Sequence, residues 1–140
     1  MDALEYLNQV KKLQHKLEMQ KMSCLNAEAA VTQTTSWVTP TSEVHAHRQD
    51  AREIAMARYM EKKEQVEKTA VELELKRNEL LEFLERLPDD RERMVLEQHF
   101  VYLRPLYRLF SDSCFSRTAI KTACRDGIKS CQALLKNKNL

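Results

Sequence analysis

The feature that most restricts the fold is the lack of helix-breaking residues between Pro40 and Pro88, a stretch of more than forty residues without proline or glycine. In its second half, apolar residues recur at alternating spacings of four and three, which is the repeat of a coiled-coil seam. The seam consists of Val66, Ala70, Leu73, Arg77, Leu80, Leu84 and Leu87. We therefore predict one long helix, in which Arg77 helps to fix the register or the number of packed helices.

A second helix is predicted before this one, from about Asp2 to about Ala30, and Asp2 can cap its start. Its stripe repeats at the same spacing and is apolar except for Gln20. The stripe consists of Ala3, Tyr6, Val10, Leu13, Leu17, Gln20 and Cys24. The Thr-rich segment 31–42 disfavours helix and is predicted to be a connection. Trp37 in this segment would either cover the end of the helical pair or bind a partner.

These two helices would pack antiparallel, because the segment between them can reverse the chain. The single glycine and the charged fraction of 31% agree with a chain built from long helices. We expect an all-α protein in which residues 1–87 form a helical hairpin, or coiled-coil arm, and residues 88–140 form a small domain. A second copy of the chain could complete the helical bundle, so we also expect a homo-oligomer through this arm.

The C-terminal part has the order of elements of a helix-turn-helix, centred on residues 105–135. Asp89 and Glu92 have the spacing of a capping box at the start of its first helix. The buried face of that helix is predicted to hold Val95, Leu96, His99, Phe100 and Leu103. Pro105 would open a short helix with Leu106, Leu109 and Phe110 facing inward. Residues 111–114 would form the turn, and Ser116 would cap the last helix.

The last helix is predicted to bury one face and to present a basic ridge on the other. The inward stripe consists of Ile120, Cys124, Gly127, Ile128, Cys131, Leu134 and Leu135. The outward face presents Arg117, Thr118, Lys121, Thr122, Arg125 and Lys129, with Arg104 and Arg108 available for phosphates. Residues 88–140 hold 10 Lys/Arg against 6 Asp/Glu, whereas residues 1–87 hold 13 against 15. This asymmetry favours double-stranded DNA as a partner, although a solvated basic face is an equally common reading.

Residues 86–135 resemble the fourth region of bacterial sigma factors. The likeness lies in Leu87-Pro88, in the Val95-Leu96-x-x-x-Phe100 run and in the closing Gly127-Ile128-Lys129 helix. The whole chain resembles small phage and prophage proteins that are sigma-region-4-like and related to ArpU-type late transcription regulators. The resemblance implies a DNA-binding transcription regulator that acts with host RNA polymerase in the bacterial cytoplasm.

The turn departs from the usual helix-turn-helix pattern at three positions. Phe110 stands where a small alanine is usual, Cys114 where glycine is usual, and Ser113 where an apolar residue is usual. These changes predict a distorted or wider angle between the two helices. The rival interpretation is therefore an interaction protein that keeps a sigma-like fold but binds RNA polymerase or another phage or host protein instead of DNA.

Other functional classes receive little support from the sequence. The only glycine, Gly127, lies inside a predicted helix, so there is no Gly-rich phosphate loop. The four cysteines form no C-x-x-C pair and no zinc-type cluster with histidine, and free cysteines in a core are expected. We expect no enzyme, no cofactor and no metal. The sequence shows no signal peptide and no membrane-spanning run, which predicts a soluble protein.

Overall fold

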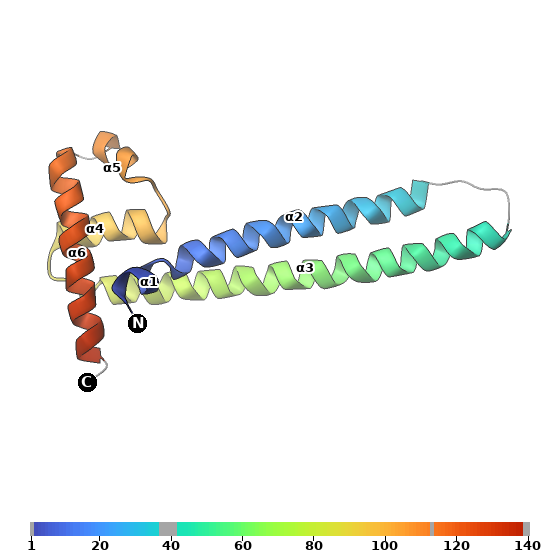
Figure 1. Ribbon diagram of the computed structural model, residues 1–140, viewed down its shortest axis with the longest axis horizontal. Helices are drawn as coiled ribbons and strands as arrows, with labels where there is room; N and C mark the ends of the chain where they lie inside the picture. Colours follow the sequence, from blue (N-terminus) through green and yellow to red (C-terminus); the bar gives the residue numbers. More distant parts are fainter. Residues whose placement is uncertain (1, 37–41, 113, 139–140) are drawn as a thin grey trace. The chain divides into compact units, whose positions relative to one another are not determined.

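The computed structural model describes residues 2–36, 42–112 and 114–138, and these form an all-α protein without strands, as predicted (Figure 1). Trp37, Pro40 and Ser113 lie outside the described residues, as do the interpretations that involve them. The elements in chain order are α1 (Ala3–Leu7), α2 (Gln9–Ser36), α3 (Ser42–Leu84), α4 (Asp90–Leu96), the π-helical turn η1 (Glu97–Val101), α5 (Leu106–Asp112) and α6 (Arg117–Lys138).

The contacts divide the chain into two compact units. One consists of Met1–Leu13 together with Leu73–Leu140, and the other of Gln14–Glu72. In the second unit, α2 and α3 run side by side in opposite directions (Figure 1). Its buried side chains are Leu17, Ala27 and Thr69. The long α3 confirms the helix predicted from the uninterrupted stretch before Pro88.

The N-terminal helix differs from its prediction at both ends. It is interrupted at Asn8, and Asp2 occupies the N-cap position of α1 without a side-chain capping bond. The Ala3 N–H instead donates to Gln132 Oε1 of α6 at 2.8 Å. At the other end, α2 continues to Ser36, into the segment expected as a connection. Thr32 fits within the helix because its hydroxyl donates to the carbonyl of Glu28 at 3.2 Å.

The predicted seam of α3 faces inward in the unit that contains the chain termini. Leu73, Leu80, Leu84 and Leu87 are buried there. Arg77 is half-buried on the same seam, and its Nη1 donates to Glu74 Oε1 at 2.9 Å. The antiparallel helix α1 covers the end of α3 with aromatic and polar contacts, since the rings of Tyr6 and Phe83 lie 4.9 Å apart and the Tyr6 hydroxyl donates to Glu79 at 3.4 Å.

The first helix of the C-terminal part begins as predicted but changes its period. Asp89 caps α4 by accepting bonds from the N–H groups of Arg91 and Glu92. In the π-helical turn η1 that follows, each hydrogen bond spans one residue more than in an α-helix, and Val101 is completely buried. Leu103, expected on the buried face, is only half-buried and adopts a left-handed φ of 56°. The predicted period was wrong at this point because an α-helical count does not allow for a π turn.

Candidate nucleic-acid interface

The last helix, α6, is anchored on α4 and α5 by its inward face. Ile120 and Cys131 are fully buried, and Ile120 belongs to a core cluster with Val95, Leu109 and Ala123. Gly127 lies where α6 meets α4, because a Cβ built on it would lie 2.9 Å from Leu96 Cδ1. The predicted inward stripe is thus confirmed for its central members, and Ala123 belongs to it as well.

The start of α6 is fixed by a side-chain cap. Ser116 Oγ accepts a hydrogen bond from the N–H of Ala119 at 3.2 Å, as predicted for an N-cap serine. The cap therefore fixes the residue at which α6 begins. Arg117 and Thr118, the first two residues of the helix, are presented from this capped end.

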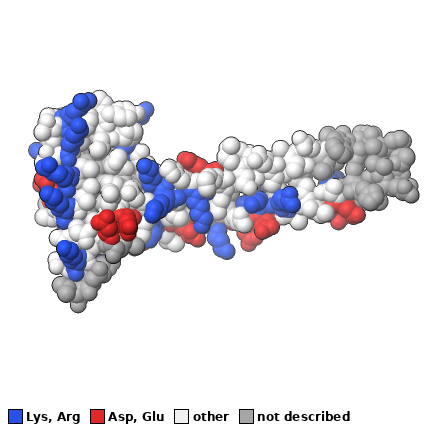
Figure 2. All heavy atoms as spheres, in the orientation of Figure 1, with Lys and Arg blue, Asp and Glu red and all other residues white. Residues whose placement is uncertain are grey.

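The opposite face of α6 is solvent-exposed and basic. Figure 2 shows Lys and Arg side chains along α6. All six candidate residues of this helix are exposed: Arg117, Thr118, Lys121, Thr122, Arg125 and Lys129. Four of them, at successive spacings of four, form what we call the basic ridge: Arg117, Lys121, Arg125 and Lys129. Arg104, which follows η1, and Arg108 of α5 are exposed too.

Two members of the basic ridge have partners within the protein. The guanidinium of Arg117 lies 5.2 Å from the centre of the Phe110 ring. Arg125 Nε lies 3.7 Å from Asp126 Oδ1, in a pair whose side chains are 68% and 45% exposed. Contacts this exposed contribute little free energy. The side chains of Lys121 and Lys129 have no ion-pair or aromatic partner among the described residues.

The unusual turn residues have different environments. Phe110 is half-buried against the core cluster, so its ring fills the space between α5 and α6 and also supports Arg117. Cys114 is exposed. The helix α5 continues to Asp112, so Ser111 and Asp112, which were predicted to lie in the turn, are helical. The expected change of inter-helix angle stays a prediction.

One flank of α6 carries acidic groups that sequence analysis did not place there. A hollow of about 220 Å³ lies between α4 and α6 and is lined by Asp89, Arg91, Glu92, Ala119, Thr122, Ala123 and Asp126. Glu92 accepts a hydrogen bond from Ser130 at 3.3 Å, and Arg91 lies 4.5 Å from the centre of the Phe115 ring. Only the fold brings the start of α4 beside the middle of α6. A polyanion would therefore meet the basic ridge on the side away from this flank.

The four cysteines lie in different environments. All four are free, and burial raises the pKa of Cys131 to about 12, with a further contribution from Glu92. Burial also raises the pKa of the half-buried Cys124 thiol. These two confirm the expected core cysteines, whereas Cys114 is exposed. Within the described residues, no group of three or more His, Cys, Asp and Glu side chains could hold a metal ion.

None of the described helices combines the length and the apolar character needed to cross a membrane. Comparison with protein-family models, with curated proteins and with solved structures finds no match to the chain. The resemblance of residues 86–135 to sigma factor region 4 therefore stays a prediction based on motifs.

Proposed function

We propose that the protein binds double-stranded DNA through the basic ridge of α6 and regulates transcription. The observation that carries this proposal is the exposure of four cations at successive spacings of four, on a helix whose other face is anchored in a core. A rigidly held helix with an outward basic ridge has the properties of a recognition helix. Its basic side chains would neutralise phosphates, and arginine can also pair with guanine.

Each candidate residue has a part in this proposal. Arg117, Thr118 and Lys121 lie nearest the capped end of α6 and would reach furthest into a major groove. Arg125 and Lys129 would continue the contact along the helix, whereas Thr122, which also lines the acidic hollow, would lie at the edge of the interface. Arg104 and Arg108 would hold phosphates beside it. In this proposal α5 and α6 form a sigma-region-4-like helix-turn-helix in residues 88–140, and the protein contacts host RNA polymerase in a phage-infected or lysogenic bacterial cell.

The proposed arm, residues 1–87, would mediate self-association. Several large apolar side chains of α2 and α3 are more than half exposed, and a packed second copy would bury part of them. They are Met19, Met22, Leu25, Ile54, Met60, Val71 and Leu75.

The proposal is tested by reversing the charge of Lys121 and Arg125 to Glu and measuring a gel mobility shift with duplex DNA at low salt. We expect the wild-type protein to bind and the double variant to lose detectable binding, while its circular dichroism spectrum and melting temperature stay unchanged. A matched control reverses Lys11 and Lys16, two exposed cations of α2, and should bind almost normally. Equal binding by both double variants would show that α6 is not part of the DNA-binding surface.

The second candidate is a protein-binding function without DNA. It is favoured by the acidic side chains of Asp89, Glu92 and Asp126 on one flank of α6, because they would repel a polyanion but not a protein partner. Recovery of RNA polymerase or another phage or host protein in a pull-down, together with no DNA shift at low salt, would favour this candidate.

A further inference from the structure

The helix α3 carries a second repeat on its outward face, in addition to the seam that packs inward. Its members follow the same alternating spacing of three and four and are Ile54, Ala57, Glu61, Glu64, Lys68 and Val71. All six are exposed, and the apolar Ile54 and Val71 are 62% and 60% exposed. The apolar members of this repeat lie at its two ends and its three middle members are charged, so charge pairing would decide what packs on this face. In the unit Gln14–Glu72, α2 lies beside α3 but leaves these six residues exposed.

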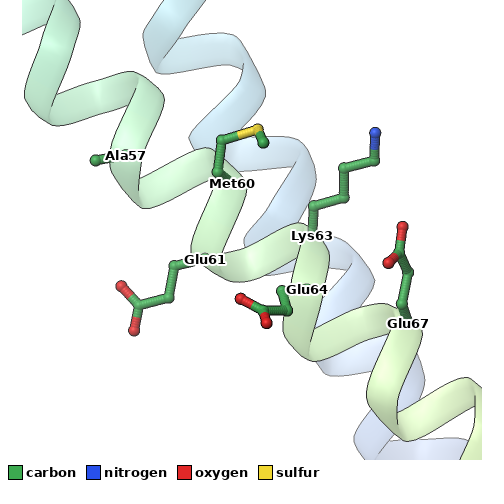
Figure 3. A pocket seen from close by; sticks show the side chains of 6 residues that line it. All are labelled: Ala57, Met60, Glu61, Lys63, Glu64 and Glu67. Atoms are coloured by element: carbon green, nitrogen blue, oxygen red, sulfur yellow. The ribbon is translucent and has the colours of Figure 1, made fainter.

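A hollow of about 580 Å³ lies on this outward face (Figure 3). Its lining comes from α3 alone: Ala57, Met60, Glu61, Lys63, Glu64 and Glu67. These residues form two overlapping sets of four, 57-60-61-64 and 60-63-64-67. Four residues with this spacing form the hole that receives one side chain of a facing helix in a coiled coil. The lining of the hollow therefore has the spacing of two adjacent coiled-coil holes.

We propose that a second copy of this chain fills the hollow, with its α3 packed antiparallel against the same face. Val71 of the second copy would occupy the first hole, between Ala57 and Met60. Lys68 of the second copy would occupy the next hole, with its stem on Met60 and its ammonium at Glu64. By two-fold symmetry, Val71 and Lys68 of the first copy occupy the same two holes of the second copy. The interface is therefore shared by two chains only, and the assembly is a dimer. This inference rests on the proposed self-association and is independent of DNA binding.

The charges of the outward repeat distinguish the two directions of packing. A parallel, in-register pair would place Glu61, Glu64 and Lys68 each opposite its own copy, so three successive layers would hold like charges. The antiparallel pair with Val71 in the first hole places Lys68 opposite Glu64. It also brings Arg58 beside Glu72 and Lys63 beside Glu67, and symmetry makes each pair twice. All of these side chains are exposed on α3. Charge complementarity therefore favours the antiparallel dimer.

Sedimentation equilibrium of the full-length protein tests this dimer through a charge swap. Glu64→Lys should weaken dimerisation at least about tenfold, because it places lysine opposite lysine. The double variant Glu64→Lys/Lys68→Glu restores opposite charges and should return the dissociation constant to within about threefold of wild type. Glu28→Lys, an exposed substitution of the same charge on α2, is the control and should leave the constant unchanged. Circular dichroism confirms that all variants keep their helices.

Cysteine cross-linking tests the register, in a background with Cys24→Ser and Cys114→Ser. The proposed packing places residue 61 opposite residue 71 of the second copy. An equimolar mixture of Glu61→Cys and Val71→Cys proteins should therefore form the mixed disulfide in preference to either self-disulfide. A preference for self-disulfides indicates parallel packing and overturns the proposal.

The remaining outcomes are equally distinct. If the wild-type protein is monomeric, both the proposed self-association and this interface are wrong. If the protein is a dimer that Glu64→Lys does not weaken, only this interface is wrong.

Discussion

Gly127 is the residue at which α6 approaches α4, and its missing side chain makes that approach possible. A Cβ at this position would lie 2.9 Å from Leu96 Cδ1 and 3.2 Å from its Cγ. Leu96 is fully buried, so an added Cβ would require its side chain to shift within the core. The only glycine in the chain thus has a packing role.

Gly127→Leu should lower the free energy of unfolding by about 2 kcal/mol, because a side chain would be forced into a filled contact. The matched control is Ala133→Leu, an exposed position on the same helix, where a change within about 0.5 kcal/mol is expected. Urea denaturation monitored by circular dichroism measures both. Equal stability of the two variants would show that α6 does not pack on α4 at Gly127.

Cys131 should react far more slowly than Cys114 with a maleimide at pH 8. Its thiol is fully buried and its pKa is raised to about 12, so almost no thiolate is present. We expect a difference in rate of at least about a hundredfold, measured by mass spectrometry of labelled peptides. Rapid labelling of Cys131 in the folded protein would contradict the observed burial.

The same raised pKa links stability to pH. The unfolded thiol ionises near its ordinary value of 9.0, and the folded thiol at about 12. The buried neutral thiol of Cys131 therefore contributes fully to the free energy of unfolding below pH 9.0. This contribution is lost as the pH rises toward about 12.

Among the elements, α4 has a side-chain cap and α1 has none. Asp89→Ala should lower the free energy of unfolding by about 1 kcal/mol, because two N–H groups lose their acceptor. Asp2→Ala is the matched control and should change it by less than about 0.5 kcal/mol, since Asp2 makes no capping bond. Thermal unfolding of both variants measures the difference. A larger loss for Asp2→Ala would contradict the assigned caps.

The sequence was sufficient where an element obeys one regular period. The long α3, its inward leucines and the caps at Asp89 and Ser116 all follow from spacing and residue type. It failed where the backbone leaves the regular α-helical period. The π turn η1 and the left-handed Leu103 are such places, and the buried Val101 lies at the end of η1. The extension of α2 beyond Ala30 was also missed, because the low intrinsic helix propensity of threonine is only a weak guide to helix ends.

At the scale of the whole molecule, the exposure of the candidate site could be predicted, but its surroundings could not. Periodicity alone places Lys121 and Arg125 on the outward face. The contact of Arg117 with Phe110 and the acidic flank around Asp126 need the fold, because they join residues from different elements. These surroundings determine the side from which a polyanion can approach.

The salt dependence of duplex DNA binding tests the basic ridge most directly. The logarithm of the association constant should fall linearly with the logarithm of salt concentration, with about 0.9 unit of slope for each phosphate neutralised. Lys121→Gln/Lys129→Gln should reduce the slope by about 2, because these two cations have no partner among the described residues. A slope identical in wild type and variant, or no binding at the lowest salt, would contradict the account.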